Sequence, residues 1–318
     1  MIVSRCPLRI SLAGGGSDLP EVSKMLKNKG KSIGFSVNWK MTLVGHPFYK
    51  GIVLKYSDIE ILKSSVEIKH KLFKEIICHL SPHLNRYEIT SMCDVIGGTG
   101  LGSSSAFSIA LINLLNFKQG LRFDKRSLAN MACTAEVEWA ERNIGYQDQY
   151  LCALGGANML TFDGEKDPIV EQISYNQSWN DLNNSPFVLY KTKGLHDSSE
   201  QLRDHKKKID SIERLIELVD PVKNAIISSN IENLSELVGE GWKIKKNMCK
   251  DSIINAHVDS VICAAKKIDC YASGKLLGSG GGGYILIITR HAQEICNMLG
   301  EEASIVAVDP NGSTVTCE

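Results

Sequence analysis

The stretch from Gly97 to Leu115, GGTGLGSSSAFSIALINLL, decides the fold that this sequence predicts. Its glycines allow positive φ angles and a close approach of the backbone to a ligand. From Ser103 onward the residues are mostly apolar or small, which predicts a largely buried helix. A helix that begins after such a loop presents unpaired N–H groups and a positive dipole end to an anion. The stretch is therefore a candidate phosphate-binding loop.

The same residues also fit a tight turn followed by a capped helix that binds nothing. The hydroxyls of Ser103, Ser104 and Ser105 suit both interpretations, because serine caps helices and hydroxyl oxygens can ligate magnesium. No Gly-Lys-Ser/Thr follows the glycines, so the stretch is not a Walker A loop. From this stretch alone both interpretations stay open.

The composition limits the class of protein. The chain has 318 residues, enough for one large or two ordinary domains, and its 36 Lys and Arg balance its 36 Asp and Glu. This balance argues against a nucleic-acid or anionic-membrane surface, and no apolar run is long enough to cross a bilayer. The 10 scattered cysteines include no C-x-x-C pair, which predicts reduced, mostly buried thiols. We expect a soluble cytoplasmic protein, and a homo-oligomer stays open.

The first part of the chain alternates predicted strands and helices. The predicted strands span residues 2–13, 32–43, 51–57, 86–92, 158–162 and 169–173. The predicted helices span residues 19–29, 64–80, 103–115 and 125–142. Residues 176–185 are polar and rich in turn-forming types, which predicts a boundary between domains at 1–180 and 181–318.

The second part opens with a predicted strand at 187–192 and then becomes strongly helical. The predicted helices span residues 198–208, 212–228, 231–248, 255–267 and 292–299. Residues 275–288 read as two strands around a four-glycine turn, and 304–308 as a last strand. This pattern predicts an α+β fold of two lobes with ligands between them.

Three glycine-rich turns, at 14–16, 97–102 and 278–283, each lie where a strand meets another element. Such turns suit a polyanionic ligand, because they bring backbone N–H groups close to it. The triple glycine at 14–16 lacks the G-x-G-x-x-G spacing of dinucleotide folds, which gives a nicotinamide site little support.

Phosphoryl transfer needs phosphate donors, a divalent metal with oxygen ligands, and a group that acts on the acceptor hydroxyl. Ser104 and a helix carboxylate are candidate metal ligands, Asp148 a candidate for the hydroxyl, and Arg9 for the developing charge. These candidates, and Asp18 and Lys275 beside the other glycine turns, also have structural explanations. Arg9 and Lys275 suit surface positions, Asp148 and Asp18 suit helix caps, and a glutamate on a helix is usually solvated.

Taken together, the three segments resemble the signature motifs of the GHMP kinases. The second motif is Gly100-Leu101-Gly102-Ser103-Ser104, and the third is the lysine-containing strand KLLGSGGGG at 275–283. The opening RCPLRISLAGGGSD at 5–18 and IGYQDQY at 144–150 resemble D-glycero-D-manno-heptose 7-phosphate kinases. The resemblance covers essentially the whole chain.

The resemblance implies a ribosomal S5-like N-terminal lobe and a ferredoxin-like C-terminal lobe. It implies an enzyme that uses ATP and Mg²⁺ to phosphorylate the anomeric C1 hydroxyl of a sugar. The first expectation is D-glycero-D-manno-heptose 7-phosphate, converted to the 1,7-bisphosphate for nucleotide-sugar and cell-surface polysaccharide synthesis. The alternatives are another sugar 1-kinase, for fucose or mannose, and a non-catalytic regulator that binds a nucleotide or a sugar.

The resemblance also implies roles for single residues. Asp148 is the expected catalytic base, and Arg9 is expected near the transferred phosphoryl group. Ser104 and Glu136 are the expected metal ligands, and Glu136 is separable by mutation from Glu138 on another helix face. The expected substrate-binding residues are Asp18, Gly15, Gly16, Ser17, Gln147 and Gly281. The expected ATP-binding residues are Gly97, Gly98, Gly100, Leu101, Gly102, Ser103, Ser104 and Ser105.

One segment departs from the pattern. Heptose 7-phosphate kinases usually carry a Thr-Gly-x-x-Arg-like turn, and the matching residues here, TKGLHDSS at 192–199, lack the arginine. If that arginine recognises the substrate in relatives, the acceptor here differs, with His196, Ser198 and Ser199 as substitutes. A helix cap is the structural alternative for Ser198.

Overall fold

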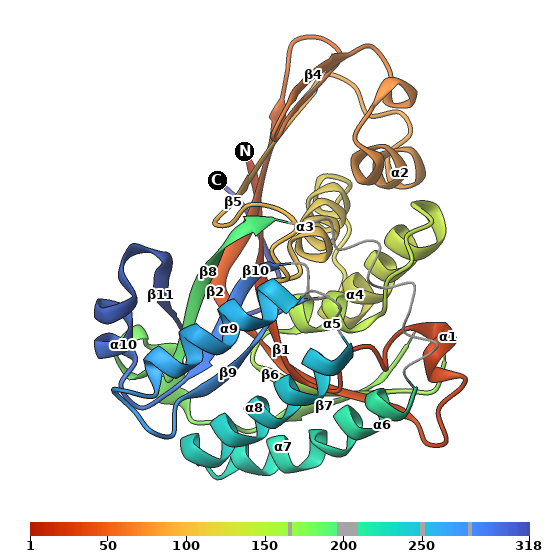
Figure 1. Ribbon diagram of the computed structural model, residues 1–318. Helices are drawn as coiled ribbons and strands as arrows, with labels where there is room; N and C mark the ends of the chain where they lie inside the picture. Colours follow the sequence, from red (N-terminus) through yellow and green to blue (C-terminus); the bar gives the residue numbers. More distant parts are fainter. Residues whose placement is uncertain (165–166, 196–208, 249–251, 279–281) are drawn as a thin grey trace.

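The computed structural model describes the chain except residues 165–166, 196–208, 249–251 and 279–281. Two β-sheets with helices packed on them form the α+β fold that the sequence predicts (Figure 1). The predicted helix at 198–208 lies outside the described residues. Within the described part of the chain, no helix is both long and apolar enough to cross a bilayer.

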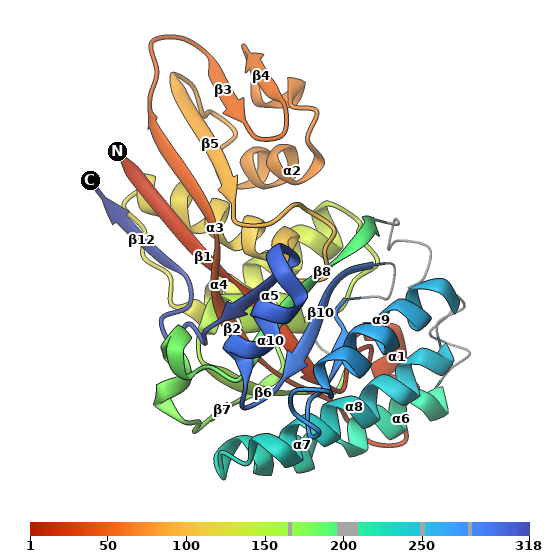
Figure 2. The same cartoon turned by 60° about the vertical axis from the view of Figure 1, so that its left-hand side comes forward.

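The larger sheet comes mostly from the first part of the chain. Its strands run in the order β12-β1-β2-β5-β3-β4, and β6 pairs with β2 and β7. Every pair is antiparallel except β3 with β5. The strands are β1 (Ile2–Ala13), β2 (Gly30–Pro47), β3 (Ile52–Lys55), β4 (Ile59–Leu62), β5 (Tyr87–Cys93), β6 (Ala157–Phe162), β7 (Ile169–Ile173) and β12 (Thr314–Cys317). Figure 2 shows both termini at one edge of this sheet, where β12 pairs with β1.

Helix α3 is the centre of the larger lobe. It lies across β1 and β2, and α2, α4 and α5 pack beside it (Figure 1). Almost all of its side chains are buried, as predicted from its apolar residues. The helices here are α1 (Pro20–Ser23), α2 (Lys71–Leu80), α3 (Ser103–Lys118), α4 (Lys125–Cys133) and α5 (Gln147–Leu154), with a π-helix at Thr134–Trp139.

The smaller sheet is antiparallel, in the order β11-β8-β10-β9. Its strands are β8 (Phe187–Leu195), β9 (Ser273–Leu276), β10 (Gly282–Ile288) and β11 (Ala303–Val306). Helices α8 and α9 pack on it, while α6 and α7 extend this layer toward the larger sheet (Figures 1 and 2). The helices are α6 (Ile209–Glu217), α7 (Val219–Ile227), α8 (Ile231–Met248), α9 (Ser252–Ala265) and α10 (Ala292–Leu299). The domain boundary near residue 180 stays a prediction, and β12 crosses back to the larger sheet.

Four predicted helices are wrong in extent. The helix predicted at 125–142 is α4 followed by the π-helix, which ends at Trp139. The helix predicted at 19–29 is only α1, because the chain must return to pair Gly30 of β2 with Phe162 of β6. The helix predicted at 64–80 starts at Lys71, because the Glu60 carboxylate accepts the backbone N–H groups of Lys69 and His70, at 2.8 and 3.2 Å. The helix predicted at 212–228 is divided at Leu218, ahead of Pro221, whose ring and missing N–H disfavour a continuous helix.

The cysteine prediction is partly wrong. None of the nine cysteines that the structure describes forms a disulfide, which agrees with reduced thiols. Only Cys6, Cys133 and Cys152 are buried, while three others are exposed. "Mostly buried" therefore does not hold.

The two lobes meet through glycine turns. A Cβ on Gly100 would lie 2.8 Å from the carbonyl carbon of Leu277, and one on Gly278 would lie 2.5 Å from Gly100 Cα. A Cβ on Gly283 would lie 2.3 Å from the carbonyl oxygen of Thr99. All three glycines have positive φ. Only residues without a side chain allow this backbone-to-backbone contact, which closes one end of a cavity between the lobes.

Candidate active site

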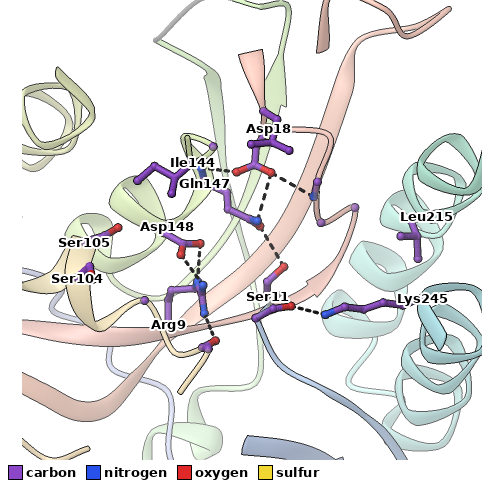
Figure 3. A pocket seen from close by; sticks show the side chains of 18 of the residues that line it. Arg9, Ser11, Asp18, Ser104, Ser105, Ile144, Gln147, Asp148, Leu215 and Lys245 are labelled. Atoms are coloured by element: carbon purple, nitrogen blue, oxygen red, sulfur yellow. Dashed lines mark hydrogen bonds and ion pairs between the residues drawn. The ribbon is translucent and has the colours of Figure 1, made fainter. Parts of the chain in front are cut away.

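A cavity of about 570 Å³ lies between the lobes, within the size range of small-molecule sites. The N-terminal lobe contributes the end of β1, the glycine turn at 14–16, the N-terminus of α3 and the segment 141–148. The other wall comes from α6, α8 and the turn after β9. Figure 3 shows polar side chains of the first lobe pointing into this space, with α6 and α8 opposite.

Arg9 and Asp148 form a two-bond ion pair at the cavity floor (Figure 3). Arg9 Nε donates to Asp148 Oδ1 at 2.6 Å, and Nη2 donates to Oδ2 at 2.5 Å. Arg9 Nη1 donates to the carbonyl oxygen of Gly100 at 2.6 Å, which ties the pair to the loop before α3. Burial alone would lower the pKa of Arg9, but the charge and hydrogen bonds of Asp148 raise it overall. The arginine is therefore a permanent cation beside the carboxylate.

Asp18 lies on the wall next to this pair and is held by its neighbours. Its Oδ2 accepts the backbone N–H of Gln147 at 3.2 Å, and its Oδ1 accepts from Gln147 Nε2 at 3.3 Å and from Gly16 N at 3.2 Å. Ser11 Oγ donates to Gln147 Oε1 at 3.1 Å, which fixes the orientation of the amide. Burial and the nearby charge of Asp148 raise the pKa of Asp18 to about 6. Asp18 is thus a buried, oriented carboxylate facing the cavity.

Gly145 makes room for this carboxylate. A Cβ at Gly145 would lie 1.8 Å from Asp18 Oδ2, far inside van der Waals contact. The glycine is therefore required by its contact with Asp18 rather than by an unusual backbone angle, since its φ is not positive.

Glu136 is fully buried and still borders the cavity. Arg142 Nη1 donates to its Oε2 at 2.6 Å, and Gln149 Nε2 donates to its Oε1 at 3.1 Å. Burial raises the pKa of Glu136, while the charge of Arg142 and hydrogen bonds from Ser105 and Gln149 act in the opposite direction. Glu138, two positions on, is exposed and lies outside the cavity lining, as expected for another face of the helix.

The loop before α3 has the geometry of an anion site. Gly98, Gly100 and Gly102 all have positive φ, and Gly102 is the N-cap residue of α3. No side chain caps this helix, so the first-turn N–H groups are not taken by an N-cap side chain. The 16 residues of α3 add a dipole with its positive end at this point.

The residues fit a magnesium ion that is shared with phosphate groups. Mg²⁺ is usually held by one or two carboxylates together with substrate phosphates, not by an all-protein cage. Accordingly, the described residues contain no cluster of three or more His, Cys, Asp and Glu side chains. A carboxylate has about four acceptor positions, and Glu136 uses three of them for Arg142, Gln149 and Ser105. One position is left, and the buried Gln149 Oε1 has no hydrogen-bond partner in the part of the chain described.

Two lysines of the smaller lobe also border the cavity. Lys275 was expected at the surface, but it is buried and donates to the carbonyl oxygen of Leu12 at 3.0 Å. Burial, Lys245 and Arg9 together hold its pKa well below the ordinary value. Lys245 donates to the carbonyl oxygens of Leu276 and Gly278, next to the glycine turn. The Lys275 contact links the wall of the smaller lobe to the end of β1.

The structure brings most of the predicted site residues together. Those that line the cavity are Arg9, Gly15, Gly16, Asp18, Gly98, Gly100, Gly102, Ser103, Ser104, Ser105, Glu136, Gln147 and Asp148. Ser17 does not, because its hydroxyl points into the turn and donates to the carbonyl oxygens of Gly14 and Lys31. Leu101 is a core residue and Gly97 is exposed beside the cavity lining. Gly281, His196, Ser198 and Ser199 lie outside the described residues.

Sequence reasoning missed several cavity residues. Ser11 lies two residues after Arg9 in β1, and side chains two residues apart point to the same face of a strand. Its position beside Arg9 could therefore be predicted from the sequence. Ile144 opens the segment IGYQDQY but received no predicted role, and nothing in the residue type of Arg142 marked it as a site residue. Leu215 and Lys245 come from helices whose packing against the first lobe has no local sequence signal.

The comparisons with known proteins agree with the fold. Residues 62–156 match the family model of the GHMP kinases N terminal domain. The curated relatives are phosphotransferases, the matched segment is similar to a GHMP kinase N-terminal domain, and the fold is similar to those of GHMP kinases, as the motifs predicted.

The individual relatives share only a low sequence identity with this chain. The chain is 24% identical over 301 residues to D-glycero-alpha-D-manno-heptose 7-phosphate kinase of Campylobacter jejuni, covering 89% of this chain and 88% of that protein. It is 23% identical over 342 residues to L-fucokinase/L-fucose-1-P guanylyltransferase of Bacteroides fragilis, covering 92% of this chain but 35% of that longer protein.

Among solved structures, the fold is similar to a D-glycero-D-manno-heptose 1-phosphate kinase from "Bacteriodes thetaiotaomicron", with a TM-score of 0.79 and 20% identity. The superposition covers 100% of this chain and 99% of that one. This likeness shows a shared fold.

Proposed function

We propose that this protein transfers the γ-phosphoryl group of ATP to the anomeric C1 hydroxyl of a sugar. The first candidate acceptor is D-glycero-D-manno-heptose 7-phosphate, because the Campylobacter relative carries the name of a kinase for that sugar. An acceptor such as fucose is the second candidate, since a fucokinase is also among the relatives. The proposal further includes Mg²⁺ as the metal and a cytoplasmic location.

One observation carries the proposal. A buried carboxylate that is oriented for hydroxyl groups, Asp18, lies in one cavity with an ion-paired carboxylate, Asp148, and the N-terminus of α3. In this arrangement a hydroxyl acceptor can bind near Asp18 and an anionic donor near the start of α3, within the same cavity as Asp148. Site geometry of this kind is what phosphoryl transfer requires, since the reaction depends mostly on positioning and charge stabilisation.

Three residues have different roles on the acceptor side of the cavity. Asp18 accepts hydrogen bonds from the sugar hydroxyls and, held by Gln147, fixes the sugar's orientation. Asp148 takes the proton of the reacting hydroxyl on a lone pair that Arg9 does not use. Arg9 stabilises the negative charge that develops between hydroxyl and phosphoryl group.

The phosphate side is formed by the loop before α3 and by Glu136. The N–H groups at the start of α3 bind phosphate oxygens, and Glu136 with Ser104 would hold the metal. When bound, Mg²⁺ supplies charge neutralisation on the phosphate chain. Closure of the cavity by α6 and α8 limits the access of water, which would otherwise compete with the sugar hydroxyl.

A coupled assay of ADP release with Mg-ATP tests the proposal. The acceptor panel contains D-glycero-D-manno-heptose 7-phosphate, sedoheptulose 7-phosphate, mannose, fucose, galactose and hexose 6-phosphates, with phosphorus NMR of the product. We expect turnover with the heptose phosphate and a new anomeric phosphate signal. Turnover with another sugar alone would move the acceptor assignment, and tight ATP binding without turnover on any sugar would favour a regulator.

A regulator is the less favoured candidate. A protein that only binds a nucleotide has no need of a base paired to an arginine next to an oriented hydroxyl-binding carboxylate. Those features are present together, in Arg9, Asp18 and Asp148.

A further inference from the structure

Arg142 reaches the cavity through an irregular piece of backbone. The π-helix widens the turn so that Ala140 N donates to Ala135 O, and Glu141 follows with a φ of 50°. The backbone N–H of Arg142 then donates back to Glu136 O at 3.0 Å. A positive φ is strained for a non-glycine residue such as Glu141. This backbone conformation turns the chain back, so that Arg142 lies next to the carboxylate of Glu136.

The guanidinium of Arg142 is only partly used by its contact with Glu136. A guanidinium carries five N–H donors, and in the described residues Arg142 places only Nη1 in a side-chain hydrogen bond, on Glu136 Oε2. Its side chain is 35% exposed and borders the cavity, whereas Glu136 is fully buried. Arg9, the other arginine of the described cavity lining, uses Nε, Nη1 and Nη2 in hydrogen bonds. Arg142 is thus the arginine with donors left for a ligand.

The neighbours of Arg142 decide which ligand it suits. Glu136 bonds to Arg142 on one side and to Ser105, in the first turn of α3, on another. The guanidinium is therefore separated by one carboxylate from the helix N-terminus that suits phosphate groups. A planar fork that bonds a carboxylate and a phosphate oxygen together is a geometry that arginine provides and lysine does not.

We propose that Arg142 is a nucleotide-binding and positioning residue: one edge of its guanidinium orients Glu136, and the free donors bind the phosphate chain of ATP. This inference rests on the proposed kinase function. It assigns to Arg142 a role on the donor side of the cavity and not in recognition of the sugar. Because the contact is a direct one, it contributes to ATP binding with or without Mg²⁺.

Calorimetry with the full chain tests this role. Wild type, Arg142→Gln, Arg142→Lys and Arg126→Gln are titrated with ATP in Mg²⁺, with ATP in EDTA, and with adenosine by displacement. Arg126 is the matched control, because it also pairs with a carboxylate, Asp167 at 2.8 Å, but lies outside the cavity lining. We expect Arg142→Gln to weaken ATP binding by about 10- to 100-fold in both buffers, in line with a charge-assisted bond. Adenosine binding stays unchanged, and Arg142→Lys recovers part of the loss.

The outcomes separate this inference from the proposed function. Unchanged ATP affinity in Arg142→Gln, or equal weakening of ATP and adenosine binding, overturns the role of Arg142. A rise in the acceptor KM alone, with ATP affinity intact, also overturns it and moves Arg142 to the sugar side. If the wild-type protein binds no ATP and phosphorylates no sugar, the proposed function itself fails.

Discussion

Replacing Gly145 by alanine tests the acceptor side of the cavity with one methyl group. The added Cβ would lie 1.8 Å from Asp18 Oδ2 and 2.3 Å from Asp18 Cγ. Restoring ordinary van der Waals contact requires the Asp18 carboxylate to move by roughly 1.5 Å. That movement breaks its bonds to Gln147, which are already 3.2 and 3.3 Å long. The variant therefore misplaces Asp18 without removing its charge.

The magnitude follows from this displacement. A misplacement of about 1 Å in a positioning group can cost about 100-fold in rate, so we expect kcat/KM for the acceptor to fall at least about 100-fold. The affinity for ADP should change by less than about twofold, because the atoms nearest to the added Cβ all belong to Asp18 and none to the loop before α3. The backbone at Gly145 does not have positive φ, so the alanine itself introduces no backbone strain.

Steady-state kinetics with the acceptor and calorimetry with ADP measure both quantities. Gly241→Ala is the matched control, because Gly241 of helix α8 also lines the cavity but its Cβ would meet the nearest side chain, Leu218, at an ordinary 3.5 Å. The control should fold and turn over normally, since alanine is favoured over glycine in a helix. If Gly145→Ala keeps kcat/KM within about threefold of wild type, Asp18 does not position the acceptor and the reasoning is refuted.

Three further predictions concern single carboxylates. The pKa of Asp18 is raised to about 6, so its carboxylate becomes protonated below that pH and kcat/KM for the acceptor should fall about tenfold per pH unit there. In a pH profile of Asp18→Asn this decrease at low pH should be absent. Asp148→Asn should lower turnover by about 10²- to 10⁴-fold with ATP affinity intact, and unchanged turnover in a single-turnover assay would remove Asp148 from the role of base. Glu136→Gln should raise the Mg²⁺ concentration needed for half-maximal activity by at least about tenfold. The same substitution at the exposed Glu138 should leave that concentration unchanged. Equal effects of the two substitutions in a Mg²⁺ titration would contradict the assignment of Glu136 as a metal ligand.

The elements that the sequence predicts well are those with a strong local pattern. Helices α8 and α10 and strand β7 have the predicted bounds, and α3 starts at the predicted Ser103. In these segments hydrophobic periodicity and the tertiary packing favour the same structure. The position of several of the proposed site residues in the cavity lining was predictable near the glycine motifs, because glycine turns mark where the backbone can approach a ligand closely.

The elements that were missed depend on contacts between distant residues. Strand β4 exists because it pairs with β3, and β12 exists because it pairs with β1 at the other end of the chain. The helix predicted at 125–142 changes to a π-helix and ends by Trp139, where the chain turns back to place Arg142 on Glu136. Lys275 is buried because two lobes close over it. None of these contacts is encoded in a local period.

The backbone contact between the turns at Gly100 and Gly278 has a consequence for protein engineering. Neither turn can change its path independently, because each occupies the space that a side chain would need on the other. Residues 97–102 and the turn that begins at 278 are therefore structurally coupled and must change together, although about 180 positions separate them in the sequence. A chimeric library built from this chain and a relative should keep both segments from the same parent, and crossovers that separate them should be enriched among inactive or misfolded clones.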